Sequence, residues 1–267
     1  MDLDFLQYDF MLRGLLAGLL VAAVMPLIGV FLVLKRYSLI ADTLSHVSLA
    51  GLAFALLFGL HPGLTAVGAS AIAALGLERL RRGSVYGEVA LAIFLSGSLA
   101  LAAVIFSLAR GFNTNLLNYL FGGVLTVSQN DIYLIAALGA VVAGVIIIFF
   151  KELVAVSYDE EAARVIGLPV KAINSGFILL AALTISMSIP VAGVLLIAAL
   201  AVIPAITALR LQKRLFVTIV YAEIISVASV LGGIIVSFYL NLAAGGTIVL
   251  LMLAIFTAVS LGIKNNG

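Results

Sequence analysis

Nine long apolar runs dominate this sequence and constrain its fold more than any other feature. They cover 10–34, 38–59, 62–80, 87–109, 130–150, 170–189, 191–211, 214–241 and 246–263. Charged or helix-breaking residues such as Lys35–Arg36 and Gly245–Gly246 separate the runs. A helix needs about 20 apolar residues to cross a bilayer, and within lipid its backbone must satisfy its own hydrogen bonds. We therefore predict an all-α, polytopic membrane helical bundle of about nine transmembrane helices, forming a single domain over residues 1–267.

Composition excludes the other classes of protein. The chain is 64% hydrophobic and 10% charged, whereas a soluble domain is about half apolar and about a quarter charged. A soluble enzyme, a secreted disulfide scaffold and a disordered protein are all excluded. The chain has no cysteine, so thiol catalysis and zinc fingers are absent. The net charge of +2 is too small for nucleic-acid binding.

Two regions bear on the number of spans. The acidic start at Asp2 and Asp4 lacks the cationic stretch of a signal peptide, so we expect the first run to be a retained span. Residues 110–129 are too polar for lipid, and we expect a loop there with a short helix packed on protein, as in a re-entrant segment. Because 170–211 is nearly continuous and is broken only around Pro190 and Gly193, eight to ten spans are compatible with the pattern.

Basic residues are distributed unequally between the two ends of the predicted spans. One side carries Lys35, Arg36, Arg79, Arg81, Arg82, Lys151, Arg164, Lys171, Arg210, Lys213, Arg214 and Lys264, and the other carries Arg13 and Arg110. Cytoplasmic loops are enriched in lysine and arginine, so the first side is predicted to be cytoplasmic. This orientation puts the N-terminus outside and the C-terminus inside.

Three ionisable residues lie well inside the predicted spans, namely Asp42, His46 and Glu223. Such groups are costly in lipid and mark either a pathway or a buried polar contact. Asp42 and His46 are four residues apart and lie on one helix face. Imidazole and carboxylate together suit zinc and manganese. The pair is therefore a candidate metal site, and the alternative is a purely structural pair.

Glu223 joins these candidates only through its expected depth. His46 and Glu223 each lie about eight or nine residues from the inner ends of their spans, which is roughly 12–14 Å at 1.5 Å per residue. We therefore expect Glu223 to be able to face the same cavity. His61, beside Pro62 in an outer loop, is predicted to be a solvated turn residue rather than a ligand.

The inner loop 151–171 carries the signals of a short helix at about 158–166. Ser157, with Glu160 three residues later, predicts a capping box at its start. Gly167 suits a left-handed C-terminal position, and Pro169 prevents continuation. The helix is either a docking element, with a small apolar surface, or a helical linker.

Motifs for independent catalysis are missing from the sequence. It contains no phosphate-binding loop of the Gly-x-x-x-x-Gly-Lys-Ser/Thr type, so the chain cannot bind ATP by that route. It also lacks His-Glu-x-x-His and Gly-x-Ser-x-Gly, which argues against an intramembrane hydrolase. The chain is expected to be a transporter subunit rather than an enzyme.

Several segments resemble one family of membrane proteins. They are RYSLIADTLSHVSLAG from 36, YLFGGVLTVSQND from 119, SYDEEAARVIGLPV from 157, PVAGVLLIAALAVIPAITA from 190 and NLAAGGTIVL from 241. In content and order they are similar to the ABC-type permeases for zinc, manganese and iron. The resemblance covers nearly the whole chain.

The resemblance implies partners and roles that periodicity does not indicate. It implies a homodimer with two cytoplasmic ATPase subunits and an extracytoplasmic metal-binding protein that delivers the cation. Asp42 and His46 match the family's polar pair and become the metal contacts, while Glu223 matches no motif. The ATPase would receive a coupling helix made of Tyr158, Asp159, Glu160, Glu161, Ala162, Ala163, Arg164, Val165, Ile166 and Gly167.

The expected protein is thus the permease subunit of an ATP-binding-cassette importer in the cytoplasmic (inner) membrane. Its cargo would be zinc or manganese, with iron as a further candidate, and no cofactor is expected to be bound permanently. Two alternatives stay open. One is a proton-coupled secondary transporter, and the other is a permease for chelated metal or cobalamin.

Overall fold

The computed structural model describes residues 9–81, 87–108, 119–120, 122–123 and 127–264, and none of these lies in a strand. The helices are α1 (Asp9–Leu34), α2 (Ser38–Phe58), α3 (Pro62–Arg81), α4 (Gly87–Leu108), α6 (Gln129–Ile148), α7 (Phe150–Tyr158), α8 (Glu160–Val165), α9 (Val170–Ala192), α10 (Val194–Arg210), α11 (Leu215–Leu240) and α12 (Ala244–Lys264). The predicted all-α fold is confirmed.

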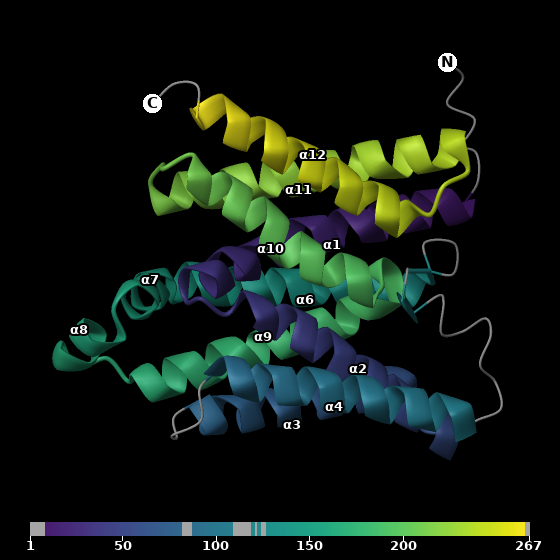
Figure 1. Cartoon of the computed structure of the whole chain (residues 1–267), viewed down its shortest axis with the longest axis horizontal. Coiled ribbons are helices and arrows are strands. Elements are labelled where there is room, and N and C mark those ends of the chain that lie inside the picture. The colour runs from purple at the N-terminus through teal and green to yellow at the C-terminus, as the bar shows by residue number, and fades with distance from the viewer. Residues whose placement is uncertain (1–8, 82–86, 109–118, 121, 124–126, 265–267) are drawn as a thin grey trace.

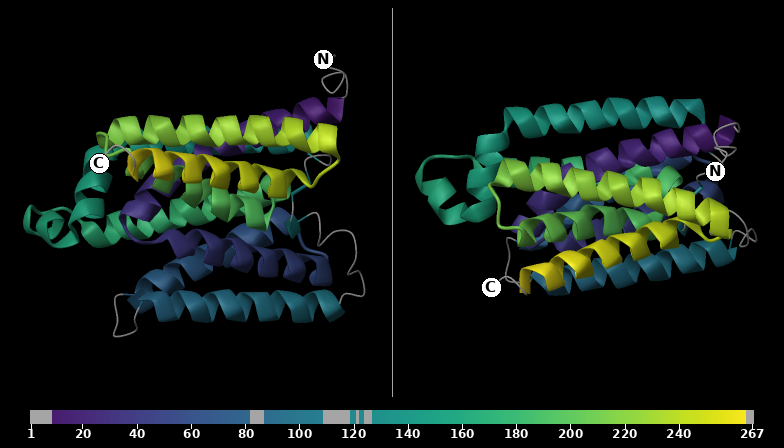
Figure 2. Two further views of the ribbon diagram at one scale, coloured as in Figure 1. Left: turned by 45° about the horizontal axis from the view of Figure 1, so that its top comes forward. Right: turned by 90° about the horizontal axis from the view of Figure 1, so that it is seen from above.

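Eight of the described helices are long and apolar enough to cross a membrane: α1, α2, α3, α4, α6, α9, α11 and α12. The shorter apolar helix α10 runs alongside them in the bundle (Figure 1). Together these helices match the nine predicted runs. The N- and C-terminal ends of the chain lie at opposite ends of the bundle in all three views (Figures 1 and 2).

The centre of the bundle is formed by α1, α2, α9 and α10, which pack against one another. Figure 1 shows α3 and α4 along one edge and α11 and α12 along the opposite edge. Of the eight long helices, α2 is the most buried: 78% of its most apolar 18-residue stretch is buried within the protein, compared with only 17% for α12. The candidate pair therefore lies on one of the least lipid-accessible helices.

The boundary between α9 and α10 falls at the second of the two predicted breaks, three residues beyond the predicted end of the run at 189. Of the two predicted breaks, Pro190 and Gly193, Pro190 lies inside α9, which continues to Ala192. The break falls at Gly193, whose φ of +78° is accessible to glycine at little cost. A proline removes one backbone donor without preventing one further half-turn of helix, so the left-handed glycine marks the actual end.

The residue that caps the start of helix α8, the short helix predicted in an inner loop, also differs from the prediction. Ser157 was predicted to cap it, but this residue belongs to α7 and its hydroxyl donates to the Leu153 carbonyl at 2.6 Å. Asp159 is the actual cap, because its extended backbone lets its carboxylate accept from the amides of Glu161 and Ala162, both at 2.9 Å. Gly167 has the predicted left-handed conformation, with φ +89°.

The predicted short helix within 110–129 falls mainly outside the described residues. At the end of that segment, Ser128 caps α6 through a capping box with Asp131. This cap fixes the first turn of α6 at the end of the bundle opposite α8 (Figure 1).

Candidate functional site

Asp42 and His46 lie side by side one turn apart on α2. The Oδ1 atom of Asp42 and the Nε2 atom of His46 are 3.5 Å apart, which is longer than a good hydrogen bond. Two ligand atoms that each lie about 2.1 Å from a tetrahedral ion are about 3.4 Å apart. The two side chains are therefore already spaced to hold one cation between them without moving the helix.

The Asp42 side of α2 is partly exposed, whereas the opposite side of the helix packs against α9. Leu39 and Asp42 lie on one helix face with His46, and Leu39 is 55% exposed while the Asp42 side chain is 37% exposed. On the opposite face, the hydroxyl of Ser48 is 2.7 Å from that of Ser186 in α9. The carboxylate thus points to a surface that a single chain leaves open.

The nearby hydroxyls do not take part in this pair. Thr43, Ser45 and Ser48 each donate to the carbonyl four residues earlier in α2, at 2.8–2.9 Å. His46 Nδ1, by contrast, is buried and has no hydrogen-bond partner. The polar groups available to a ligand at this position are therefore the carboxylate and the imidazole.

Glu223 lies elsewhere in the bundle. It is on α11, which packs against α1, α10 and α12, whereas α2 packs mainly against α3, α4, α9 and α10. Its Oε1 atom is buried without a hydrogen-bond partner. Within the described residues, no group of three or more His, Asp or Glu side chains is gathered for a metal. Glu223 is thus not joined to the Asp42–His46 pair within one chain.

A cavity of about 570 Å³, mainly apolar but with a few polar side chains in its lining, opens at the end of the bundle opposite α8. It is lined by His61, Pro62, Gly63, Leu64, Val67, Tyr119, Val127, Asp131, Leu134, Ser186, Met187 and Pro190. His61 is exposed, as predicted for a turn residue. Burial raises the pKa of the Tyr119 hydroxyl, and the Asp131 carboxylate raises that pKa further.

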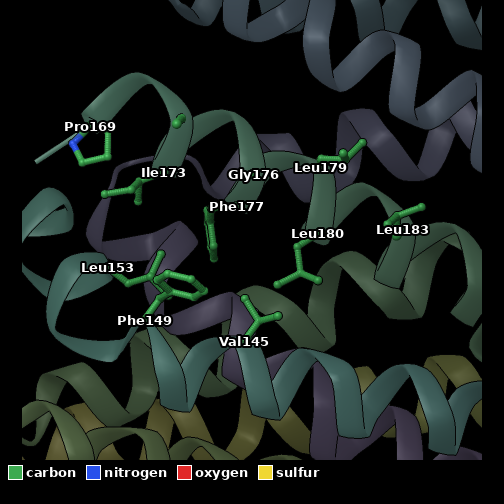
Figure 3. Close-up of a pocket in the computed structure, with 11 residues that line it drawn as sticks. Val145, Phe149, Leu153, Pro169, Ile173, Gly176, Phe177, Leu179, Leu180 and Leu183 are labelled. Atoms are coloured by element: carbon green, nitrogen blue, oxygen red, sulfur yellow. The ribbon is translucent and has the colours of Figure 1, made fainter.

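A second cavity, of about 470 Å³, lies between α9 and the α6–α7 region and is entirely apolar in its lining (Figure 3). Phe149, Leu153, Phe177 and Leu180 surround it in Figure 3. No side chain in this lining offers a nitrogen or oxygen ligand, so this cavity is unsuited to a bare cation.

The helix α8 projects from the bundle and exposes apolar side chains. Val165 is 87% and Ile166 is 72% exposed, and Tyr158 just before the helix is exposed too. Ala163 faces inward and packs with Val156 and Val170. A short capped helix that turns large apolar groups to solvent has the character of a docking surface.

One set of buried polar residues was not predicted from the sequence. From the sequence, Lys35 served only to predict which side of the membrane is cytoplasmic. In the structure Lys35 is buried, and its ammonium donates a hydrogen bond to Asn174 Oδ1 at 2.6 Å. Asn174 Nδ2 in turn donates to Glu160 Oε1 at 2.9 Å. An asparagine within the first turns of an otherwise apolar span was the available signal.

A many-helix membrane bundle with a polar pair inside one helix and a capped helix projecting from one end is characteristic of membrane transport permeases. The chain matches the ABC 3 transport family over residues 7–262, and it belongs to that family.

Curated relatives and a solved structure extend this assignment. The chain is 35% identical to a "Probable metal transport system membrane protein" of Treponema pallidum, over 94% of this chain and 96% of the relative. It is 31% identical to the "Manganese transport system membrane protein MntC" of Listeria monocytogenes, covering 94% and 90% of the two chains. It is 30% identical to the "High-affinity zinc uptake system membrane protein ZnuB" of Haemophilus influenzae, covering 91% and 94%.

The structural likeness covers nearly the same length. A chain of PsaBC from Streptococcus pneumoniae, solved in complex with Fab, superposes with a TM-score of 0.87 at 28% identity. The match covers 97% of this chain and 95% of that one. The fold is therefore that of an ABC transporter permease, and the chain is a transporter subunit.

Proposed function

We propose that this chain is the permease subunit of an ATP-binding-cassette importer. The importer carries a divalent metal ion, which is zinc, manganese or iron, into the cytoplasm. The observation that carries the proposal is the Asp42–His46 pair, whose 3.5 Å spacing suits one bound cation. The relatives named for manganese and for zinc support a divalent metal as cargo.

The distribution of charge supports an orientation in the inner membrane with the α8 end in the cytoplasm. The α8 end carries the basic residues Lys35, Arg36, Arg79, Lys151, Arg164, Lys171, Arg210, Lys213, Arg214 and Lys264. Positive residues are retained on the cytoplasmic side. In this orientation the cavity lined in part by His61 and Asp131 opens outside, where an extracytoplasmic metal-binding protein would release its cation.

A second copy of the chain would complete the ligand set. One chain offers two ligands, and the face that carries them is partly open. A carboxylate turned towards lipid would cost about 2.5–3.5 kcal/mol at mid-membrane, which favours a covered surface. Two copies related by a two-fold axis would bring together two carboxylates and two imidazoles, enough for a tetrahedral ion.

Energy would come from a separate ATPase docked on α8. The chain has no phosphate-binding loop of its own. Val165 and Ile166 offer the exposed apolar surface, and the acidic first turn with Glu160 and Glu161 adds charge. ATP-driven movement of α8 would then switch access to the cation site.

The direct test is radiolabelled metal uptake in cells that lack their own importer and express this chain with its matched ATPase and binding protein. We expect Asp42→Ala and His46→Ala to reduce uptake to background while the complex still assembles, because each removes half of the ligands. Ser45→Ala is the control, since that hydroxyl bonds only its own helix. Wild-type uptake by both pair variants would reject the cation site.

The same cells separate the alternative functions. Uptake that survives ATP depletion but collapses with an uncoupler would indicate a proton-coupled secondary transporter. Competition by a metal chelate rather than by free zinc or manganese would indicate a permease for chelated metal or cobalamin. Glu223→Gln in this assay tests the prediction that Glu223 faces the same pathway as His46. Unchanged uptake by this variant would remove Glu223 from the pathway.

Cross-linking tests the second copy. The chain has no cysteine, so Leu39→Cys introduces a single thiol on the face of the pair. We expect oxidation to give a disulfide-linked dimer on a non-reducing gel, because equivalent residues near a two-fold axis meet. Ile72→Cys, 75% exposed on α3, is the control that should remain monomeric. Equal cross-linking at both positions would contradict the proposed interface.

A further inference from the structure

Three polar side chains join α8 to the turn that precedes α2. The Asn174 amide, on α9, accepts a hydrogen bond from Lys35 Nζ at 2.6 Å through Oδ1. The same amide donates to Glu160 Oε1 at 2.9 Å through Nδ2. Lys35 belongs to the α1–α2 turn and Glu160 begins α8, so this path connects the proposed ATPase-docking helix with the helix of the cation pair.

The chemistry of the amide determines its direction in this path. Asparagine is a neutral side chain that accepts at one end and donates at the other. The lysine cation orients its oxygen and the glutamate carboxylate orients its nitrogen, and both hydrogen bonds are charge-assisted. Asn174 and Lys35 are buried, so breaking either bond would be costly and the two ends are held together.

Aromatic packing holds the same junction from a second side. The Lys35 ammonium is 5.9 Å from the centre of the Phe177 ring, one turn beyond Asn174 on α9. Phe31 of α1 packs edge-on against Phe177 at 6.1 Å and against Phe150 of α7 at 6.2 Å. The end of α1 is thereby packed between α7 and α9.

The turn between α1 and α2 is short and tightly bonded. The Lys35 amide donates to the Phe31 carbonyl at 3.0 Å and the Tyr37 amide to the Leu32 carbonyl at 2.7 Å. Helix α2 begins at Ser38, and Asp42 follows Lys35 by seven residues, about 10 Å at the helical rise. A displacement of Lys35 is therefore transmitted to α2 rather than absorbed in a flexible loop.

We propose that Asn174 is a positioning residue that couples the position of α8 to that of α2 through the contacts Glu160–Asn174–Lys35. This inference rests on the proposed function, in which α8 receives the ATPase and α2 holds the cation. When the ATPase moves α8, the amide carries that movement to the α1–α2 turn and so to Asp42 and His46.

The first experiment measures coupling in proteoliposomes that contain the permease with its ATPase and binding protein. ATP hydrolysis and metal uptake are measured in the same vesicles. We expect Asn174→Ala to reduce metal moved per ATP hydrolysed by about tenfold, a typical size for coupling between two sites. Ser188→Ala, on the same helix and bonded only to its own backbone, should leave the ratio unchanged. An unchanged ratio in Asn174→Ala would overturn the proposal.

A double-mutant cycle distinguishes coupling from simple loss of stability. Glu160→Ala and Lys35→Met break the two ends of the path, and the double variant breaks both. We expect the double variant to be no less coupled than either single variant, because the effects of residues in one network are not additive. Fully additive losses would show that the two ends act independently, and would overturn the proposal.

A fluorescent label separates this inference from the identity of the cargo. Ser38→Cys places one thiol at the first residue of α2 in a cysteine-free chain. We expect its signal to change when the ATPase binds ATP, and to stop changing in the Asn174→Ala background. An equal response in both backgrounds, or none in either, would overturn the coupling path. If the fluorescence response depends on Asn174 but the vesicles take up no metal, only the proposed cargo would be rejected.

Discussion

Glycine residues decide how closely the central helices approach. A Cβ at Gly29 on α1 would lie 2.7 Å from the carbonyl carbon of Ala201 on α10. A Cβ at Gly18, on the same helix, would lie 3.5 Å from both Val230 and Ile234 of α11, an ordinary van der Waals distance. In lipid, helices associate through such close packing, since burial of apolar surface adds little.

These two glycines predict opposite results for the same substitution. Gly29→Ala should destabilise the protein by about 1–3 kcal/mol, because α1 and α10 must separate to admit the methyl group. Gly18→Ala should be neutral or stabilising, since alanine is favoured over glycine within helices by about 1 kcal/mol. Thermal unfolding in detergent measures both, and equal midpoints would contradict the close contact at Gly29.

Helix α8 is short, so its ends determine whether it forms. It has six residues, and isolated helices of that length are not stable in water. The Asp159 carboxylate accepts hydrogen bonds from two amides in the first turn of the helix. The acidic residues of this turn interact favourably with the positive end of the helix dipole. Gly167 then allows the left-handed exit towards α9.

The corrected cap gives a prediction at the scale of this element. Asp159→Ala should cost about 1 kcal/mol of helix stability, and thus weaken binding of the proposed ATPase partner by about fivefold. Ser157→Ala should change binding little, because that hydroxyl bonds within α7. Affinity of the purified permease for its ATPase measures both variants. A larger loss for Ser157→Ala would restore the cap expected from the sequence.

Among the described residues, eight helices are long and apolar enough to cross a membrane, and the shorter α10 would make a ninth crossing. Nine crossings would place the two ends of the chain on opposite sides of the membrane, in keeping with Figure 1, where α1 begins and α12 ends at opposite ends of the bundle. Helix α11 is one of the eight long helices, so we expect the turns on either side of it to face opposite compartments.

Labelling with a membrane-impermeant thiol reagent tests this arrangement in intact cells. Leu242→Cys, in the α11–α12 turn, should react from outside. Gln212→Cys, in the α10–α11 turn, should react only after permeabilisation, because the proposed orientation puts the basic end in the cytoplasm. The reverse pattern would invert the proposed orientation and place α8 outside, beyond the reach of an ATPase.

Much of the fold follows from the sequence because hydropathy is local. The run predicted at 38–59 is α2 at Ser38–Phe58, and the run at 214–241 is α11 at Leu215–Leu240. The Asp42–His46 contact is also local, since residues four apart on a helix must be neighbours. Gly167 was predictable for the same reason, through its own backbone preference.

Only the tertiary structure decided which helices are neighbours. Hydropathy placed Glu223 at the depth of His46, but α11 packs on α1, α10 and α12 rather than mainly on α2. The Ser48–Ser186 contact and the path from Lys35 through Asn174 to Glu160 likewise join residues far apart in the chain. Lipid and protein interior are equally apolar, so an apolar helix face does not reveal which of the two it meets. The sequence therefore determines the spans, whereas their partners depend on packing between distant segments.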